Sequence, residues 1–373
     1  MNNKNDICVS HKQSNVNNFQ SASTLSVDIK KYCWTQTCTP GTGCSDVWFT
    51  SAQVGWTVTN RGQILHTTDG GDSWTCQFEL KRKNGRGILR SMQFIDEQTG
   101  WVGILNDGDG RLLLKTSDGG KCWETITRSE ICVVPGNTNK SVKVEPPKGV
   151  CGIHMVSSSV IYVSGTYSLK NCPPKVMKTT DGGVTWQITD MSAHASTLID
   201  IFFFDEKRGF VVGGYAKCPD DLSQLVPVVL YTDNGGETWT NQVPDAEHHF
   251  EKNQWGWKID FLDQNQQIGY VSLESPCFAA ILKTQDGGMN WQYCKVEPSP
   301  SSRNQLQGIG FVTADHGWVG SQIGPSSVTY DGGETWTNVE ILENVNRFRV
   351  VKDKDKDIVY AAGEYVYRGT PMA

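Results

Sequence analysis

The chain has 373 residues, 20% of them charged, and a formal net charge of -6. This slightly acidic balance argues against a general surface for nucleic acid or anionic membranes, so we expect no nucleic-acid partner. No apolar run approaches the roughly 18 residues that a helix needs to cross a bilayer, which argues against direct membrane insertion. Glycine (38 residues) and tryptophan (13 residues) are abundant, and both concentrate in a repeated motif.

The N-terminal segment is polar and contains no apolar stretch typical of a signal peptide. We therefore predict a disordered arm over residues 1–27 and a single folded domain over residues 28–370. The chain contains 12 cysteines, which fits either disulfides in an extracytoplasmic compartment or reduced structural thiols. The cysteine count slightly favours the first interpretation, whereas the missing export signal favours the second.

The octapeptide TTDGGDSW, which begins at Thr67, returns five times with small changes. The other copies begin at Thr116, Thr179, Thr232, Thr284 and Thr329. Successive copies lie roughly 45–63 residues apart, a period typical of a structural unit that stacks on its neighbours. A catalytic motif normally occurs once, so the repetition indicates a fold and not an active site.

Short alternating apolar segments precede the octapeptides and predict four strands in each repeat. In the first unit, one strand begins at the Gly55–Trp56 pair and the next ends at Thr67. Apolar segments such as SMQFID and DIFFFD come before the Gly-aromatic pairs, and a fourth strand follows each octapeptide. The third unit departs from this pattern, because Ile161 stands where the other units have glycine.

The octapeptide has the chemistry of a tight hairpin between the third and fourth strands. The carboxylate of Asp69 can accept hydrogen bonds from backbone N–H groups further along the turn, and Gly70 and Gly71 allow backbone angles that other residues avoid. Trp74 starts the fourth strand, and we expect its ring to pack between adjacent sheets. The fourth copy has Asn234 in place of Asp, and we expect the same turn because Asn keeps the acceptor oxygen.

The six hairpins assign a structural role to twelve residues. They are Asp69 and Trp74, Asp118 and Trp123, Asp181 and Trp186, Asn234 and Trp239, Asp286 and Trp291, and Asp331 and Trp336. Four-stranded units of this length, repeated around an axis, predict an all-β fold, a β-propeller of antiparallel blades.

Only six hairpins are present, but we predict seven blades. After Trp336 the chain has segments for three more strands, over 347–351, 358–362 and 365–368. Near the N-terminus, Trp34 lies in a strand-like segment that no octapeptide precedes. We predict that this segment pairs beside 365–368 as the fourth strand of the last blade, which closes the ring and removes an exposed sheet edge.

The hairpins match the Asp-box (BNR) pattern Ser/Thr-x-Asp-x-Gly-x-x-Trp, which occurs in sialidases, sortilin-type receptors, xyloglucan-active hydrolases and photosystem II assembly and stability factors. The longer unit over residues 55–74 resembles the last family almost position by position. That resemblance implies a non-enzymatic scaffold, located in the periplasm, in the thylakoid lumen or on the thylakoid surface. We expect a monomer without a cofactor or metal. The resemblance also implies a polypeptide partner, a membrane-protein precursor or an acidic segment. A glycoside hydrolase of the Asp-box class is the alternative.

Strand order separates two faces of the predicted ring. The Asp-box hairpins and the turns between first and second strands lie on one face, which we call the Asp-box face. The opposite face, which we call the insert face, carries the connections between blades and the turns between second and third strands. The long inserts fall there, at residues 127–150, 167–174, 215–227, 243–254 and 296–304. Because length varies on this face alone, we predict that it binds the partner.

Three arginines lie on or beside predicted innermost strands: Arg90, Arg347 and Arg349. Such a group can bind a carboxylate or an acidic peptide by bidentate hydrogen bonds. The alternative is ordinary charge balance with Asp46, Asp200 and Asp260, which are predicted to line the same channel.

The stretch that enters the fifth blade is a second candidate for partner binding. It contains His248, His249, Trp255, Trp257 and Lys258. Aromatic side chains often anchor protein interfaces, although one of these tryptophans could equally pack inside the blade.

One insert is flanked by two cysteines, Cys132 and Cys151. A disulfide between them would tie the base of the insert. The alternative for the cysteines, a thiolate metal site, is disfavoured because the ring spreads these residues apart.

Overall fold

The structure is a computed structural model that describes most of the chain. The described residues are 31–41, 43–81, 87–105, 107–134, 145–165, 173–217, 221–244, 250, 252–262, 266–277, 279–297, 305–354 and 356–372. The predicted arm at 1–27 and the residues His248 and His249 lie outside them. No helix in these ranges is long and apolar enough to cross a membrane.

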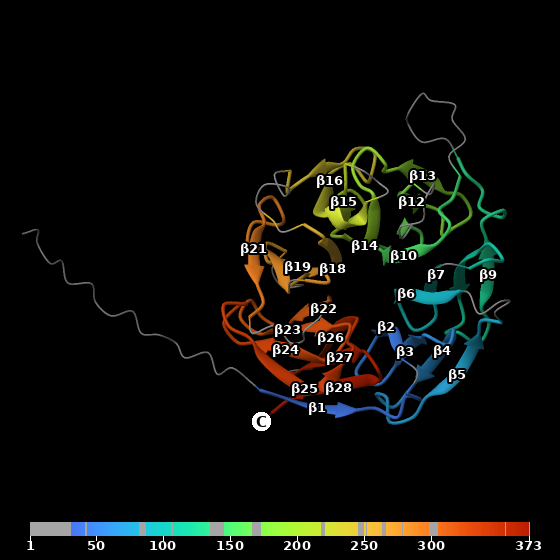
Figure 1. The fold of residues 1–373 in the computed structure, drawn as a ribbon. Helices are drawn as coiled ribbons and strands as arrows, with labels where there is room; N and C mark the ends of the chain where they lie inside the picture. Colours follow the sequence, from blue (N-terminus) through green and yellow to red (C-terminus); the bar gives the residue numbers. More distant parts are fainter. Residues whose placement is uncertain are drawn as a thin grey trace, which may run out of the picture.

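The strands form seven antiparallel four-stranded sheets, arranged around a central axis as the blades of a propeller (Figure 1). Blade 1 contains β2 (Cys44–Phe49), β3 (Gly55–Thr59), β4 (Gln63–Thr67) and β5 (Thr75–Glu79). Blade 2 contains β6 (Ile88–Phe94), β7 (Gly100–Leu105), β8 (Arg111–Thr116) and β9 (Glu124–Thr127). Blade 3 contains β10 (Val150–Met155), β11 (Ile161–Gly165), β12 (Lys175–Thr179) and β13 (Gln187–Asp190). The predicted fold class is confirmed.

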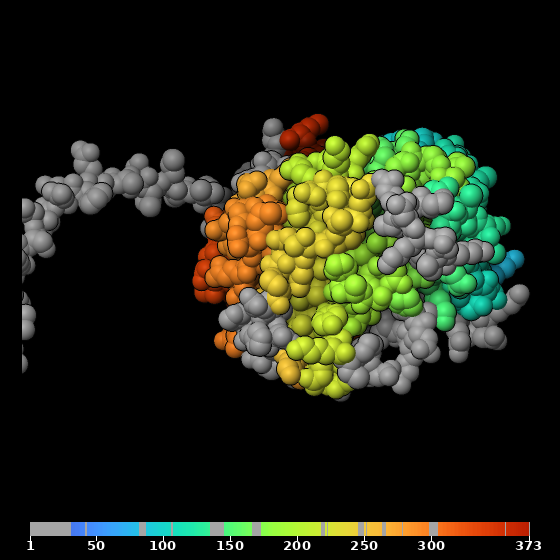
Figure 2. All heavy atoms as spheres, turned by 90° about the horizontal axis from the view of Figure 1, so that it is seen from above, coloured from blue at the N-terminus to red at the C-terminus, as the bar shows by residue number. Residues whose placement is uncertain are grey.

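The remaining blades continue around the ring in chain order. Blade 4 contains β14 (Thr197–Phe203), β15 (Gly209–Tyr215), β16 (Val226–Thr232) and β17 (Thr240–Asn241), with a short 3-10 turn, η1 (Leu222–Gln224). Blade 5 contains β18 (Trp255–Phe261), β19 (Gly269–Glu274), β20 (Ala280–Thr284) and β21 (Gln292–Lys295). Blade 6 contains β22 (Leu306–Phe311), β23 (Gly317–Ser321), β24 (Pro325–Thr329) and β25 (Thr337–Glu343). Seen edge-on in Figure 2, the blades make a thick disc.

Blade 7 combines the two ends of the domain, as the sequence predicted. It contains β26 (Arg347–Asp353), β27 (Lys356–Ala362), β28 (Val366–Pro371) and, outermost, β1 (Tyr32–Gln36). In Figure 1, β1 lies beside β28 at the rim of the ring. The two strands pair antiparallel, with Trp34 opposite Gly369. The Trp34 ring meets the Trp318 ring of blade 6 edge-on at 5.4 Å, so β1 also joins two blades.

Aromatic rings interlock each blade with the next. The ring on the second strand of one blade stacks on a phenylalanine at the end of the first strand of the following blade. The stacked pairs and their centroid distances are Tyr360 and Phe49 (3.4 Å), Trp56 and Phe94 (3.8 Å), Tyr162 and Phe203 (3.5 Å), and Tyr270 and Phe311 (3.6 Å). The hairpin tryptophan then meets that phenylalanine edge-on, as Trp74 does with Phe49. This repeated contact explains the three aromatic positions of the sequence unit.

The same contact explains the glycine of the Gly-aromatic pair. Gly209 lies opposite Phe203 in the hairpin of β14 and β15, and a Cβ on that glycine would overlap the phenylalanine ring. In blade 3 the glycine is replaced by Ile161, and its partner is the thinner, flexible side chain of Met155. The departure seen in the third unit is therefore a coupled change of two facing residues.

The Asp-box hairpins form as predicted. In the first, Oδ1 of Asp69 accepts hydrogen bonds from the Thr67 hydroxyl at 2.7 Å and from the Ser73 backbone N–H at 2.8 Å. The Asn234 hairpin keeps this geometry, because its Oδ1 accepts from Thr232 at 2.9 Å and from the Thr238 N–H at 3.0 Å.

The hairpins also bind the preceding blade. A basic side chain on the third strand of one blade donates to the carbonyl of the first box glycine in the next blade. The donor and acceptor residues are Lys115 and Gly182 (2.9 Å), Lys178 and Gly235 (3.2 Å), Lys283 and Gly332 (3.0 Å), and Arg368 and Gly70 (3.1 Å). The described contacts of the hairpins thus join blades around the ring.

Removal of residues 1–40 should abolish the cooperative unfolding of the ring or lower its melting temperature by at least ~10 °C, because β28 would lose its partner. The substitution Trp34→Ala should destabilise the protein by about 2–3 kcal/mol through loss of its contact with Trp318. Circular dichroism melts would measure both effects, with the exposed Thr35→Ala as control. A truncated protein that melts like the full chain would contradict closure by β1.

The substitution Gly209→Ala should destabilise the protein by about 1–3 kcal/mol, because the new methyl group meets the Phe203 ring. The second change Phe203→Met should recover part of that loss, as in blade 3, with a coupling of at least ~1 kcal/mol in a double-mutant cycle. Urea unfolding of the four proteins measures the cycle. Gly108→Ala, where a Cβ meets nothing within 4 Å, is the control. Additive effects would contradict the steric coupling.

Candidate binding site in the central channel

Corresponding positions of the seven innermost strands form rings of side chains around the channel. The strand registers place one such ring in the middle of the channel: Asp46, Ser91, Gly152, Asp200, Lys258, Gly308 and Arg347. In the first five blades, a register shift of the β-bulge type immediately precedes this position, and in blade 6 the shift includes it. Bulges re-aim side chains. The ring is unevenly filled, since its four charged residues are accompanied by three small ones.

The two aspartates of this ring tie neighbouring blades together. Oδ2 of Asp46, in blade 1, accepts a hydrogen bond from the backbone N–H of Met92 in blade 2 at 3.0 Å. Oδ2 of Asp200, in blade 4, accepts from the N–H of Ile259 in blade 5 at 3.2 Å. Both carboxylates are buried, so each requires a positive partner in addition to these amides.

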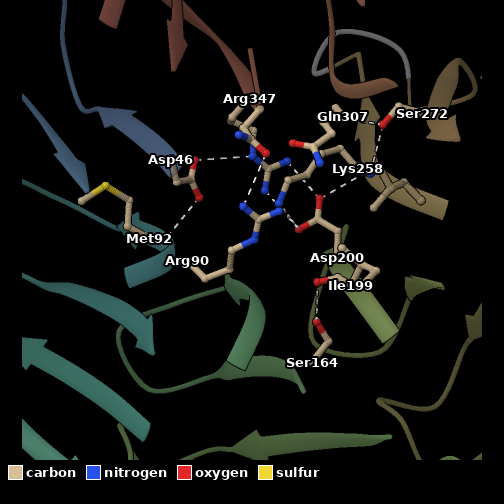
Figure 3. Close-up of polar contacts among 12 residues, drawn as sticks. Asp46, Arg90, Met92, Ser164, Ile199, Asp200, Lys258, Ser272, Gln307 and Arg347 are labelled. Atoms are coloured by element: carbon tan, nitrogen blue, oxygen red, sulfur yellow. Dashed lines mark hydrogen bonds and ion pairs between the residues drawn. The ribbon is translucent and has the colours of Figure 1, made fainter. Parts of the chain in front are cut away.

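Arg347 supplies that partner by reaching across the channel (Figure 3). Its two terminal nitrogens bind the Asp200 carboxylate at 2.9 and 3.0 Å, and its Nε lies 3.5 Å from Oδ1 of Asp46. The guanidinium therefore links blade 7 to blades 4 and 1 through a bidentate, buried ion pair. Burial raises the pKa of Asp200, but Arg347 and Lys258 outweigh it and lower that pKa to about 2.

Lys258 is a second buried cation in the same ring. Its Nζ lies 3.7 Å from Oδ1 of Asp200, and its side chain is 0% exposed. Burial, followed by the charge of Arg347, lowers the pKa of Lys258 to about 7. The lysine is therefore only partly charged at neutral pH, and Arg347 carries most of the compensation for Asp200.

The charged ring divides the channel into two cavities. One, of about 290 Å³, opens on the insert face and is lined by Arg90, Trp257, Gln307 and Asn346 among others. The other, of about 670 Å³, opens on the Asp-box face. Arg347 and Asp200 form part of the lining of the larger cavity only. A ligand in one cavity is thus separated from the other cavity by an ion pair.

Arg90 is the cation of the insert-face cavity. Its guanidinium carbon lies 4.8 Å from the centre of the Trp257 ring, and its Nη1 donates to Oδ1 of Asn346 at 3.4 Å. Its Nη2 is buried and has no hydrogen-bond partner among the described residues. A guanidinium held in this way presents an unfilled donor next to a polar cavity.

A buried glutamate adjoins this cavity. Glu274 accepts hydrogen bonds from the Trp255 indole and from the Gln307 amide, each at 3.1 Å. Burial raises the pKa of Glu274 to about 7, although Arg90 acts in the opposite direction. Trp255 thus fixes a carboxyl group inside the blade.

The structure brings the predicted site residues together but separates their roles. Arg347 is occupied by Asp200 and Asp46, which supports the charge-balance interpretation for that residue. Arg349 lies over the Trp48 ring at 4.4 Å and lines the Asp-box-face cavity. Lys258 is fully buried and lines neither cavity, so its contact with a partner stays a prediction.

The predicted disulfide between Cys132 and Cys151 is not formed. The Cys132 carbonyl accepts a hydrogen bond from the Trp186 N–H at 2.9 Å, which places Cys132 at the outer edge of blade 3, whereas Cys151 lies in the innermost strand β10. Four strand spacings of about 4.8 Å separate these positions, from β10 across β11, β12 and β13 to the Cys132 segment. A disulfide requires Cα atoms within roughly 7 Å. The start of this insert therefore runs along the rim and does not project from the insert face.

Several interactions escaped the sequence analysis. The pairing of Arg90 with Trp257 and the role of Glu274 depend on which blades face each other across the channel. The burial of Glu274 could have been predicted, because it is the single carboxylate in the apolar strand segment GYVSLES. Among the residues that the structure describes, no group of three or more His, Cys, Asp or Glu side chains is arranged to hold a metal ion.

Comparison with known proteins agrees with this architecture. Residues 29–166 match the family described as "Photosynthesis system II assembly factor YCF48". The Photosystem II assembly lipoprotein Ycf48 of Synechococcus sp. (strain CC9902) is 24% identical over 155 residues, which span 40% of this chain and 39% of that protein. The chain is an Asp-box β-propeller that is similar to the photosystem II assembly factors.

Solved structures show how widely this fold is used. YCF48 bound to a D1 peptide superposes with a TM-score of 0.58 and 16% identity, over 93% of this chain and 99% of that one. An ancestral GH74 enzyme superposes equally well, with a TM-score of 0.58 and 13% identity, over 90% of this chain and 46% of that one. At these identities the likeness shows the fold alone, so function must be argued from the channel.

The free energy of unfolding should rise as the pH increases from 7 to 9, by up to about 1.4 kcal/mol per pH unit from Lys258. The unfolded lysine, with a pKa near ~10.4, binds its proton in this range, whereas the buried lysine releases it. Urea unfolding at several pH values would measure the slope. The substitution Lys258→Met should remove this contribution, whereas the surface change Lys352→Met should keep it. Equal slopes in the wild type and Lys258→Met would contradict the assignment.

Proposed function

We propose that the protein is a non-enzymatic scaffold that binds a polypeptide through the insert face, as an assembly factor of the photosystem II type does. The family match and the Asp-box repeat support this class of function. One structural neighbour, YCF48, was solved with a bound D1 peptide, which supports a polypeptide as partner. The partner would be a membrane-protein precursor or an acidic segment, and the protein would act as a monomer without a cofactor.

Arg90 is the observation that carries this proposal. Its guanidinium lies over the Trp257 ring, and its buried Nη2 has no hydrogen-bond partner among the described residues. It also lines the cavity that opens on the insert face. A carboxylate of the partner would complete its hydrogen bonds. Asn346 and Gln307, which line the same cavity, would contact the backbone of the bound segment.

The other predicted partner residues then have supporting roles. Trp257 positions the guanidinium of Arg90, and Trp255 holds Glu274 at the edge of the cavity. Arg347 and Lys258 form the floor that closes the channel beneath the site. The curated relative is a lipoprotein, which supports an extracytoplasmic or membrane-associated location for this chain as well.

A glycoside hydrolase is the alternative, because a GH74 enzyme shares the fold. Such an enzyme needs two carboxyl groups on either side of a bond, one of them protonated to act as general acid. Asp200 and Asp260 line the larger cavity, but the low pKa of Asp200 and its bidentate contact with Arg347 disqualify it as the acid. A screen with chromogenic glycosides tests this alternative directly, and turnover would support it.

The substitution Arg90→Ala should weaken the binding of a D1 peptide by at least about 10-fold, because a charge-assisted pair is lost. Fluorescence anisotropy with a labelled synthetic peptide would measure the dissociation constant. Arg61→Ala, in an exposed turn of the insert face, should change it less than about two-fold. Arg347→Ala is unsuitable because it would leave two buried carboxylates uncompensated. Unchanged binding by a folded Arg90→Ala protein would count against the proposed role.

A further inference from the structure

The larger cavity, on the Asp-box face, plays no part in the function proposed above. We propose that it is a second binding site, for a small carboxylate that carries an aromatic or branched aliphatic group. The cavity measures about 670 Å³, within the range of roughly 300–1,000 Å³ usual for small-molecule sites. It is closed at its inner end by the ion pair of Arg347 and Asp200.

One wall of the cavity is apolar and comes from blades 4, 5 and 6. It includes Phe202, Phe204, Leu262 and Val312. The Phe202 and Phe204 rings meet edge-on at 5.2 Å and are only partly buried, so they expose apolar surface to the cavity. Burial of a ligand's apolar group against them would be favourable by the hydrophobic effect.

A neutral histidine extends this wall. His154 lies 5.1 Å from the Phe202 ring and also lines the cavity. Burial and the charge of Arg349 lower the pKa of His154 to about 4, so the imidazole adds no charge at neutral pH. The wall therefore favours an uncharged group.

The opposite wall is positively charged and comes from blades 7 and 1. Arg349 lies over the Trp48 ring, with its Nε 3.4 Å from the Val47 carbonyl and its Nη2 3.8 Å from Asp46. Both contacts are long for a guanidinium. The planar guanidinium is thus available for a carboxylate at the cavity surface.

The charges around the cavity favour an anion. Three basic side chains and two carboxylates line it: Arg347, Arg349, Lys352, Asp200 and Asp260. Arg347 is paired with Asp200 and Lys352 with Asp357, which leaves Arg349, with only long contacts, as the cation that a ligand can reach. In Figure 1, β26, which carries Arg349, lies across the channel from β14, which carries Phe202. A ligand that spans the cavity therefore needs a carboxylate at one end and an apolar group at the other.

Isothermal titration calorimetry with N-acetyl-phenylalanine and with its primary amide would test the charge requirement. The acid should bind with a dissociation constant on the order of 1 mM, and the amide at least about 10-fold more weakly. N-acetylglycine, which lacks the apolar group, should also bind at least about 10-fold more weakly. Equal binding of acid and amide, or no binding of the acid up to about 10 mM, would overturn the proposal.

Substitutions of Arg349 would test whether this residue binds the carboxylate. Arg349→Gln should reduce the affinity for the acid to that for the amide, and Arg349→Lys should restore only part of it because the planar fork is missing. Lys352→Gln is the matched control: this side chain is exposed and pairs with Asp357 at 2.8 Å, so its loss should change binding less than about two-fold. Thermal melts would show that the variants are folded. Wild-type affinity in Arg349→Gln would refute the assignment.

The same carboxylate chemistry occurs in free metabolites and at the C-terminus of a polypeptide. Ala-Ala-Phe with a free or an amidated C-terminus distinguishes them. If Ala-Ala-Phe with a free C-terminus binds about 10-fold more tightly than N-acetyl-phenylalanine, and the amidated peptide does not, the ligand is the end of a polypeptide. If the two acids bind with equal affinity, the ligand is a small metabolite. Arg90→Ala should leave all of these affinities unchanged, so the outcome is independent of the insert-face proposal.

Discussion

The rest of the structure depends on the packing of seven sheets into a closed ring. At four of the interfaces between neighbouring blades, an aromatic ring on the second strand of one blade stacks on a phenylalanine of the next blade. The stack of Tyr360 on Phe49 joins the last blade to the first, at a centroid distance of 3.4 Å. The same stack joins three further pairs of neighbouring blades, so closure of the ring repeats a contact that is used elsewhere in it. The Asp-box hairpins add the polar contacts that hold neighbouring blades in register.

The blades resemble one another in their packing but differ in the side chains that line the central channel. These differences create the candidate binding sites. Identical blades would place identical side chains in every ring, which could not neutralise one another. Here Arg347 is set against Asp200 and Asp46, and glycine and serine leave room for it to cross. A buried ion pair contributes little net stability, but it fixes the arrangement of the blades that supply it. It also gives the two faces of the disc chemically different cavities.

The fold could be predicted from the sequence because the same turn and strand pattern occurs in six copies, and each copy indicates the same local structure. Trp34, which no octapeptide precedes, and the missing fourth strand after Trp336 together predicted the strand that closes the ring. The pairing of Arg347 with Asp200 could not be predicted, since it joins residues from blades 7 and 4 through strand bulges that leave no clear sequence signal. The path of Cys132 along the rim was missed for a related reason: strand order indicates where an insert leaves a blade but not where it runs. The sequence of the third unit, by contrast, shows both Met155 and Ile161 in place of Phe and Gly. Their coupling became clear only from their pairing in the structure.

The pairing of β1 with β28 has a consequence for biogenesis. The first strand of the propeller is made before all the others, yet its partner β28 is the last of the described strands to be synthesised. Contacts between such distant residues carry a high entropic cost, so they form late. A ribosome-bound chain can hold six finished blades while the seventh still lacks an edge. The native ring therefore cannot close until β28 has been synthesised, and a chain that export or folding machinery binds before that moment is still open.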